Sequence, residues 1–297
     1  MQQELYMTEE EYRRYRIKMI FSKIGIYTFL VLIALFIVIP FYWMIATALR
    51  STNELGNPSI SFFPKEWHFE NFIGALDYAA DRSANFFRFY LNTITVGALT
   101  TILSMITVIL AAFAFARLRF RGRDALFSIF LATMMIPGEI YVISNFATIS
   151  AFGLLNTYAA MVIPFIVDVF YIFFLRQTFM QIPNELYLAA KVDGTSDFKY
   201  LWKVMIPMSR ATITTIFILS MMGTWNAYVW PNLVATEPEM YLVSNGLLRI
   251  YQDIDGAGEI LNYQMAAATM VTVPLLIVFL LLKKYIMRGV SRSGIKG

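Results

Sequence analysis

The sequence contains no cysteine and a single histidine, His68. Without thiols, disulfide bonds and thiolate metal sites are excluded. One imidazole also argues against a histidine-based metal site or catalytic centre, because such sites combine several ligating or proton-transferring groups. We therefore expect no metal ion in this protein.

The motifs of common enzyme classes are missing as well. The sequence has no nucleophile elbow, no zinc-binding helix, no dinucleotide fingerprint and no phosphate-cradling glycine-rich loop. We therefore expect no catalytic residues, no cofactor and no ATP hydrolysis by this chain itself. If the protein moves a solute uphill, the energy must enter through a partner.

Charged residues are scarce. Only 15% of the 297 residues are charged, whereas 58% are hydrophobic, with 26 phenylalanines, 17 tyrosines and 17 methionines. This exceeds the apolar surface that a soluble domain can bury, so the composition indicates a membrane protein. The net charge of +4 comes from basic residues spread over four segments between apolar runs, which argues against nucleic acid as a partner.

Six apolar runs are long enough to cross a bilayer, which takes about 20 helical residues. These runs must be helical, because lipid offers no partner to an unpaired backbone N–H or C=O. We predict an all-α integral membrane protein with one six-span domain over residues 24–284, flanked by tails at 1–23 and 285–297. The predicted transmembrane helices are Ile24–Leu49, Asn92–Ala116, Leu126–Phe146, Tyr158–Leu175, Ala211–Leu233 and Tyr263–Leu282.

Lysine and arginine indicate the orientation of these spans. Nineteen of the 24 basic residues fall on one side, in both tails and in the segments after spans two and four. Basic residues accumulate on the cytoplasmic side of membrane proteins. We therefore predict cytoplasmic N- and C-termini in a multi-pass protein of the cell (inner or cytoplasmic) membrane.

One long polar segment, residues 181–207, joins spans four and five on the predicted cytoplasmic side. Pro183 and Glu185 favour the first turn of a helix, and Asp193 followed by Gly194 favours its end, since glycine tolerates a left-handed backbone. A second helix is predicted from about residue 197 to 207, at the membrane surface. The segment predicts a helix, a turn and a second helix.

The first of these helices has two possible roles. Ala189 and Ala190 form a small-residue face that another protein can approach closely, which favours a docking surface. Alternatively, the helix is solvated and only ties two spans together. The residues alone leave both interpretations open.

The same segment resembles the signature cytoplasmic loop of permease subunits in binding-protein-dependent ATP-binding-cassette importers. That pattern is roughly Glu-Ala-Ala, three residues, Gly, and a hydrophobic tail that ends in Ile-x-x-Pro. Leu188-Ala189-Ala190, Gly194 and Ile206-Pro207 match it. Leu188 departs from it, since the family usually has glutamate there. Acids remain nearby at Glu185 and Asp193, and Leu188 could instead make a hydrophobic contact in the same groove.

The rest of the chain resembles the maltose-type sugar permeases over nearly its whole length. Matching stretches include residues 111–123, Met135-Ile136-Pro137, Trp225 to Pro231 and the C-terminal Gly294 to Gly297. The resemblance implies a heterodimer with a second permease, two ATPase subunits and an extracytoplasmic solute-binding protein that touches residues 232–262. By the same resemblance, the cytoplasmic coupling helix would contact an ATPase through Glu185, Leu188, Ala189, Ala190, Asp193 and Gly194.

Four polar residues are candidates for the substrate pathway. Asp168 lies within predicted span four, where a carboxylate costs about 2.5–3.5 kcal/mol and should face the protein interior or a water-filled cavity. It either accepts hydrogen bonds from a sugar or pairs with a polar group of a neighbouring span. Asn145, Asn226 and Tyr228 are further candidates, because amides bind hydroxyls and aromatic rings stack on sugars.

These observations predict a permease subunit of an importer for a sugar or oligosaccharide. The alternative substrate is glycerol 3-phosphate or another polyol, but the spans contain no cation between their ends to favour a phosphate. A lone ion-coupled secondary transporter is a rival, yet it would show paired intramembrane acids or inverted repeats, whereas Asp168 is solitary. The identity of the solute stays open.

Overall fold

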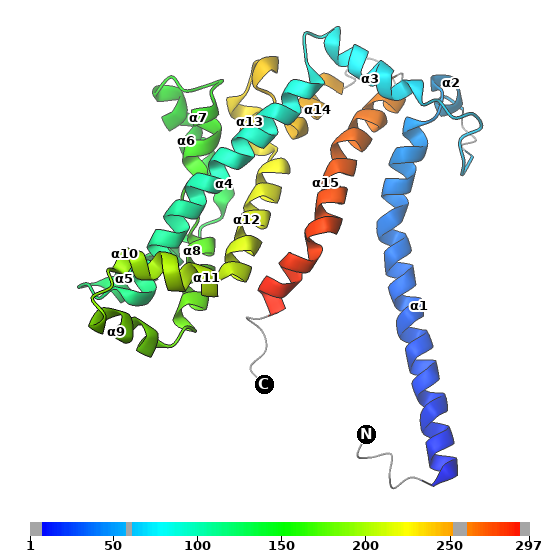
Figure 1. The fold of residues 1–297 in the computed structure, drawn as a ribbon. Helices are drawn as coiled ribbons and strands as arrows, with labels where there is room; N and C mark the ends of the chain where they lie inside the picture. The colour runs from blue at the N-terminus through cyan, green and yellow to red at the C-terminus, as the bar shows by residue number, and fades with distance from the viewer. Residues whose placement is uncertain (1–7, 58–60, 252–259, 292–297) are drawn as a thin grey trace.

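The computed structural model describes residues 8–57, 61–251 and 260–291, and all regular structure in these ranges is helical (Figure 1). The α-helices are α1 (Glu9–Ala48), α2 (Thr52–Leu55), α3 (Glu70–Ala80), α4 (Phe86–Arg117), α5 (Arg123–Thr133), α6 (Gly138–Ala151), α7 (Tyr158–Val162), α8 (Val169–Met180), α9 (Asn184–Val192), α10 (Asp197–Tyr200), α11 (Ile206–Met208), α12 (Arg210–Trp225), α13 (Val229–Val234), α14 (Val243–Tyr251) and α15 (Leu261–Ser291). Short 3₁₀ turns lie at Ile163–Phe165 and Pro238–Met240, and a π-helical turn at Leu201–Met205.

Three helices are each long and apolar enough to cross a membrane: α1, α4 and α15. Three bent pairs pass the same test together, namely α5 with α6 (94°), α7 with α8 (46°) and α10–α11 with α12 (82°). The chain therefore has six spans if each bent pair crosses once. The number of crossings and the side on which the termini lie stay predictions.

Three predicted spans are not continuous helices. The third breaks between Thr133 and Gly138, because Pro137 has no N–H to donate and its ring excludes a helical turn before it. The fourth breaks before Val169, where the chain passes through a 3₁₀ turn that contains Pro164. The fifth ends at Trp225, and the chain turns before α13 begins. Hydropathy averaged over a window does not register these breaks.

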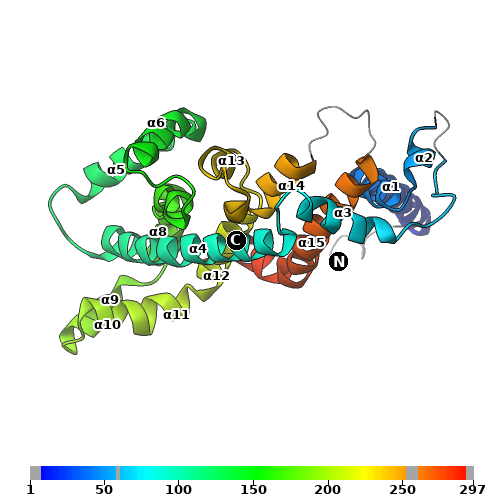
Figure 2. The ribbon, with the colours of Figure 1, turned by 90° about the horizontal axis from the view of Figure 1, so that it is seen from above.

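The helices pack in the spatial order α8, α4, α12, α15 and α1 (Figures 1 and 2). Helix α4 lies between α8 and α12, and a β-carbon on Gly97 of α4 would come within 2.8 Å of Met221 Sδ on α12. Glycine at this position leaves room for the Met221 side chain, which would have to shift to admit a larger residue. Helix α4 contacts α8 on one side and α12 on the other, and the two polar surfaces described below lie beside it and beyond its end.

The first and last helices extend past the predicted spans. Helix α1 begins at Glu9, within the predicted N-terminal tail, and α15 continues to Ser291, within the predicted C-terminal tail. The apolar window of α1 is 0% buried, and the chain becomes buried only at residues 46–50, at the end of the helix and just after it. Lipid or another subunit must therefore cover α1.

Buried polar contacts hold the C-terminal end of α1 in place. Arg50 is fully buried, with Nε 3.3 Å from Glu54 Oε1. Asn71 of α3 donates through Nδ2 to the Arg50 carbonyl at 2.8 Å, and Asn262 of α15 donates to Asn71 Oδ1 at 3.2 Å. Arg50, α3 and the start of α15 therefore form a small cap over the C-terminal end of α1. Residues 252–259, part of the segment 232–262 expected to touch the solute-binding protein, lie outside the described residues.

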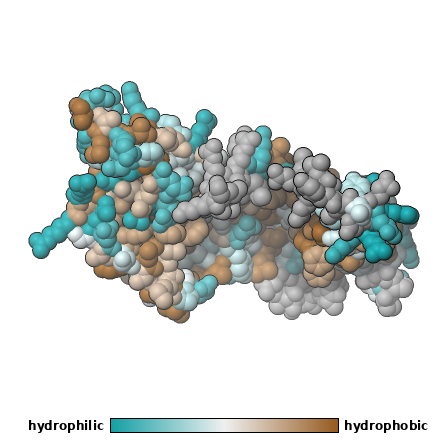
Figure 3. All heavy atoms as spheres, turned by 90° about the horizontal axis from the view of Figure 1, so that it is seen from below, coloured by the Kyte–Doolittle hydropathy of each residue, from teal (hydrophilic) through white to brown (hydrophobic). Residues whose placement is uncertain are grey.

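The opposite end carries α9, α10 and the loop between α4 and α5. Seen from below, hydrophilic side chains gather over this end of the molecule, beside more hydrophobic surface (Figure 3). The polar segment between spans four and five is thus presented at the surface.

Candidate functional site

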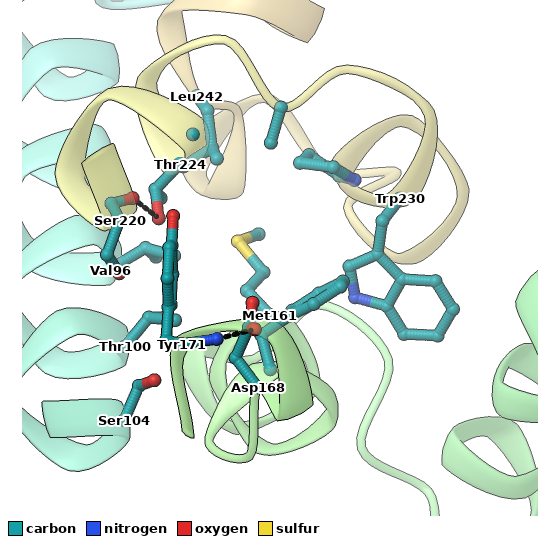
Figure 4. A pocket seen from close by; sticks show the side chains of 14 residues that line it. Val96, Thr100, Ser104, Met161, Asp168, Tyr171, Ser220, Thr224, Trp230 and Leu242 are labelled. Carbon is teal, nitrogen blue, oxygen red and sulfur yellow. Dashed lines mark hydrogen bonds between the residues drawn. The ribbon is translucent and has the colours of Figure 1, made fainter. Parts of the chain in front are cut away.

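A pocket of about 200 Å³ lies between α4, α8, α12 and α13 (Figure 4). On α4 its wall is formed by Val96, Thr100 and Ser104, which are four residues apart and therefore share one helix face. The other lining residues are Met161, Phe165, Asp168, Tyr171, Ser220, Gly223, Thr224, Ala227, Trp230, Pro231 and Leu242.

Asp168 lies in the pocket wall where span four breaks. It is the N-cap of α8, and its Oδ1 accepts a hydrogen bond from the Tyr171 backbone N–H at 2.9 Å (Figure 4). Among the described residues, no side chain of a neighbouring span pairs with it. The carboxylate caps the N-terminus of α8 by accepting a hydrogen bond from a backbone N–H. Because it is only half-buried, it also remains accessible from the pocket.

Hydroxyl groups form much of the remaining polar wall. Ser220 Oγ lies 3.1 Å from Thr101 Oγ1, and Thr224 Oγ1 donates to the Ser220 carbonyl at 3.3 Å. Thr100 Oγ1 is buried and has no hydrogen-bond partner in the described ranges. None of the described lining residues is basic. The pocket can exchange hydrogen bonds with a hydroxylated solute, and it offers such a solute one carboxylate and no cation.

The side of the pocket near α13 is closed by packed aromatic and polar groups. Trp230 is buried, donates through Nε1 to the Ala160 carbonyl at 2.9 Å and meets the Phe165 ring edge-on at 6.0 Å. Nearby, Asn92 of α4 donates to the Tyr241 carbonyl at 3.0 Å and accepts from the Tyr158 hydroxyl at 2.7 Å. These contacts tie α4, α7 and the segment before α14 together.

Three predicted pathway residues do not line the pocket. Asn145 is half-buried on α6, Tyr228 is 38% exposed, and Asn226 is exposed with its Nδ2 bonded to the Met222 carbonyl at 2.9 Å. Asn226 and Tyr228 lie in the turn between α12 and α13, where Ala227, between them, lines the pocket instead. The four-residue spacing of hydroxyl groups on α4 and α12 was the sequence signal for this wall.

The polar segment after α8 folds into an elbow, defined here as α9, the turn at 193–196 and α10. Pro183 precedes α9 and Glu185 lies in its first turn. Gly194 has φ +68°, a conformation that favours glycine, and the Thr195 N–H donates to the Ala190 carbonyl at 2.8 Å. The helix, turn and second helix therefore lie where the residue pattern predicts them, although their coupling role stays a prediction.

Polar side chains clamp the two arms of the elbow. Asp197 Oδ1 accepts from the Tyr187 hydroxyl at 2.6 Å and lies 2.7 Å from Lys191 Nζ. The Tyr187 ring also packs against Tyr200, with centroids 5.1 Å apart. The hydrogen bonds from Lys191 and Tyr187 lower the pKa of Asp197, and the bond to Asp197 raises the pKa of Lys191.

The predicted coupling residues do not all face outward. Ala190 is half-buried and packs against the core, so the small-residue face is reduced to Ala189. Leu188 is 51% exposed and Val192, one turn later, is 87% exposed. Leu188, Ala189 and Val192 make the outer face of α9 mainly apolar, and Glu185 is exposed in its first turn. The sequence did not separate the two alanines, because their orientation depends on how α9 packs.

Three comparisons relate the chain to known proteins. An arabinooligosaccharides transport system permease protein of Bacillus subtilis (strain 168) is 25% identical over 279 residues, which cover 93% of this chain and 96% of that protein. An sn-glycerol-3-phosphate transport system permease protein of Agrobacterium fabrum (strain C58) is 27% identical over 266 residues, 89% of this chain and 94% of that protein. A crystal structure of a bacterial ABC transporter involved in the import of the acidic polysaccharide alginate contains a chain with a TM-score of 0.77 and 25% identity, over 91% of this chain and 98% of that chain.

Residues 104–292, well over half of the sequence, match the family described as "Binding-protein-dependent transport system inner membrane component". The resemblance to importer permeases is confirmed, and the chain belongs to the family of inner membrane components of binding-protein-dependent transport systems.

Proposed function

We propose that this chain is one of two different permease subunits in an ATP-driven importer of a neutral sugar or oligosaccharide. The observation that carries the substrate class is the pocket beside α4, whose polar wall consists mainly of hydroxyl groups and one carboxylate. Hydroxyl and carboxylate oxygens accept hydrogen bonds from sugar hydroxyls, and Trp230 and Phe165 offer apolar surface to sugar rings.

A second candidate substrate is glycerol 3-phosphate. The Agrobacterium relative, whose name states that substrate, supports it. The described pocket argues against it, because Asp168 would repel a phosphate and no basic lining residue would offset that repulsion. A neutral hydroxylated solute is therefore the better fit.

The energy for transport enters through the elbow. The outer face of α9, with Leu188, Ala189 and Val192, contacts a groove of an ATPase subunit that hydrolyses ATP, and Glu185 lies at its edge. The exposure of these side chains supports this role. Leucine at 188 makes the contact mainly hydrophobic, so it does not depend on the ion pair expected from the family's glutamate.

The elbow and both termini lie on the cytoplasmic side of six membrane crossings. An extracytoplasmic solute-binding protein delivers the substrate on the opposite side, near residues 232–262. A second permease subunit and membrane lipid cover the apolar surface of α1. The concentration of basic residues on one side supports this orientation.

Purification of the tagged chain from its native membrane tests these assignments. We expect a second permease and an ATPase to co-purify, and ATP hydrolysis to rise when one sugar and its binding protein are added. A complex stimulated by glycerol 3-phosphate and by no neutral sugar would reverse the substrate assignment. A chain that purifies alone, without ATPase activity, would contradict the proposed assembly.

A further inference from the structure

A cluster of arginines follows the C-terminal end of α4. Helix α4 ends at Arg117, and the loop to α5 contains Arg119, Arg121 and Arg123. Residues 119–125 surround an open hollow of about 620 Å³. The hollow is separate from the pocket beside α4, and neither the proposed transport pathway nor the elbow uses it.

Two of these arginines have no protein partner. Arg123 pairs with Asp124, with Nε 3.0 Å from Oδ1. Arg119 and Arg121 are exposed, and neither makes a hydrogen bond or ion pair with any described residue. Asp124 is the single acid in the lining of the hollow, so the hollow keeps a net positive charge.

Two further arginines behind the loop are already bonded. Arg117 donates through Nη2 to the Phe179 carbonyl at 2.8 Å, and Arg176 donates through Nε to the Phe115 carbonyl at 3.3 Å. Backbone carbonyls do not neutralise a guanidinium charge, so both residues add positive potential behind the loop. The free arginines in front of them are thus placed to receive an anion.

The surroundings of the hollow are those of a lipid headgroup. It follows directly after a membrane-spanning helix, so it lies at the level where the hydrocarbon layer ends. Phe120, between the two free arginines, is 41% exposed, and Leu126 and Ile129 on α5 are 41% and 61% exposed. Apolar side chains next to paired guanidinium groups match acyl chains next to a phosphate.

We infer that Arg119 and Arg121 bind the headgroup phosphate of an anionic phospholipid in the leaflet that borders the elbow. Phe120 and the exposed apolar face of α5 contact the first part of its acyl chains. The lipid holds the α4–α5 loop against the membrane surface. This inference does not depend on which solute is transported.

The test measures lipid binding to the purified full transporter complex. The probe is phosphatidylglycerol in nanodiscs that otherwise contain phosphatidylcholine, and the lipid retained after extraction is counted by native mass spectrometry. The variant is Arg119→Gln/Arg121→Gln, which removes two side chains without described partners. Arg13→Gln/Arg16→Gln on α1 is the control, because it removes the same charge from exposed positions.

Each arginine that donates a hydrogen bond directly to the headgroup phosphate contributes about 1.5 kcal/mol, roughly a factor of ten in affinity. We expect the loop variant to bind phosphatidylglycerol about 100-fold more weakly, and the control, which makes no such bond, to retain nearly all binding. Equal loss in both variants would overturn the inference, since it would indicate general charge attraction. Equal retention of phosphatidylcholine would also overturn it.

Two further measurements distinguish a lipid headgroup from the other anionic partners that the arginines could bind, a soluble anion or a protein surface. If inorganic phosphate displaces phosphatidylglycerol at comparable concentration, the hollow is a site for a soluble anion and the lipid assignment is wrong. If the loop variant loses the ATPase subunit but keeps its phosphatidylglycerol, the arginines belong to a protein interface and the assignment is again wrong. Retained subunits with lost lipid support the inference.

Discussion

The hydroxyl of Tyr187 on α9 lies 2.6 Å from Oδ1 of Asp197 on α10 and donates a hydrogen bond to it. Lys191 Nζ reaches the same oxygen at 2.7 Å. One carboxylate oxygen thus joins the helix proposed to contact the ATPase to the helix that leads back to span five. This arrangement ties the two arms of the elbow together, as the proposed transmission of a displacement from the ATPase requires.

Tyr187→Phe should loosen the elbow without unfolding it. The variant keeps the ring contact with Tyr200 and loses one hydrogen bond, worth about 1 kcal/mol or roughly fivefold in local opening. We expect faster hydrogen exchange over residues 184–200 and fewer solute molecules imported per ATP hydrolysed. Tyr12→Phe on exposed α1 is the matched control. Unchanged exchange in the elbow would show that the hydroxyl does not stabilise it.

The clamp should be insensitive to pH across the neutral range. The pKa of Asp197 is lowered by its bonds to Lys191 and Tyr187, so its contribution is present above the usual aspartate pKa and is lost as pH falls through the lowered value. The pKa of Lys191 is raised by Asp197, so its contribution is lost only as pH rises through a value above the usual lysine pKa. We therefore expect the distance between the two arms of the elbow to stay constant between about pH 5 and pH 10.

Spin labels can check this expectation, because the chain has no cysteine of its own. Labels at Val192→Cys and Phe198→Cys, both exposed sites on the two arms, report the distance across the elbow. The permease is labelled before assembly with unlabelled partners. A distance distribution that broadens between pH 6 and pH 8 would show that another group controls the clamp.

Asp168→Asn separates the two roles of this residue. Asparagine caps a helix about as well as aspartate, whereas alanine costs about 1 kcal/mol. We expect Asp168→Asn to keep the thermal stability and to weaken solute uptake about tenfold or more, since a hydrogen bond to a charged group is worth about 1.5–3 kcal/mol. Uptake measured over a range of solute concentrations checks this. An unaltered uptake curve would leave Asp168 with the capping role alone.

Gly223 offers a way to fill the pocket. It lines the pocket from α12, and a β-carbon there would meet no heavy atom within 4 Å. Gly223→Trp should therefore occupy the cavity and abolish uptake, while membrane insertion and subunit assembly persist. Gly223→Ala is the control and should transport normally, with a stability gain of up to about 1 kcal/mol from helix propensity. Normal uptake by the tryptophan variant would place the pathway elsewhere.

The outer face of α9 can be blocked at one exposed position. Ala189→Arg should release the ATPase during purification while the elbow stays folded, because the side chain points away from the core. Gly194→Pro should instead deform the elbow, since proline fixes φ near −65° and Gly194 has φ +68°. Retention of the ATPase by Ala189→Arg would falsify the assignment of this face to docking.

Much of the elbow could be predicted from local chemistry. Pro183, Glu185 and Gly194 act on the backbone within one turn of their own position, so their effect does not depend on distant residues. The orientation of Ala190 could not be predicted in the same way. Whether it faces the core or the solvent depends on the rotation of α9 against residues far along the chain.

The pocket residues also include some that could be predicted from the sequence and some that could not. Asp168 was recognisable because a carboxylate in an apolar run is costly wherever the run folds. Thr100, Ser104, Ser220 and Thr224 passed unnoticed, since single hydroxyls are tolerated in membrane helices. They form one wall only because α4 and α12 pack with those faces toward the same cavity.

The sequence by itself determined that the chain is helical and belongs in a membrane, because apolar composition and run length act on every segment independently. Its ordered motifs also identified the importer permease family. Only the tertiary structure decided which hydroxyl groups share a pocket and which face of α9 is free. Those features depend on contacts between residues far apart in the chain, and a hydropathy pattern carries no information about them.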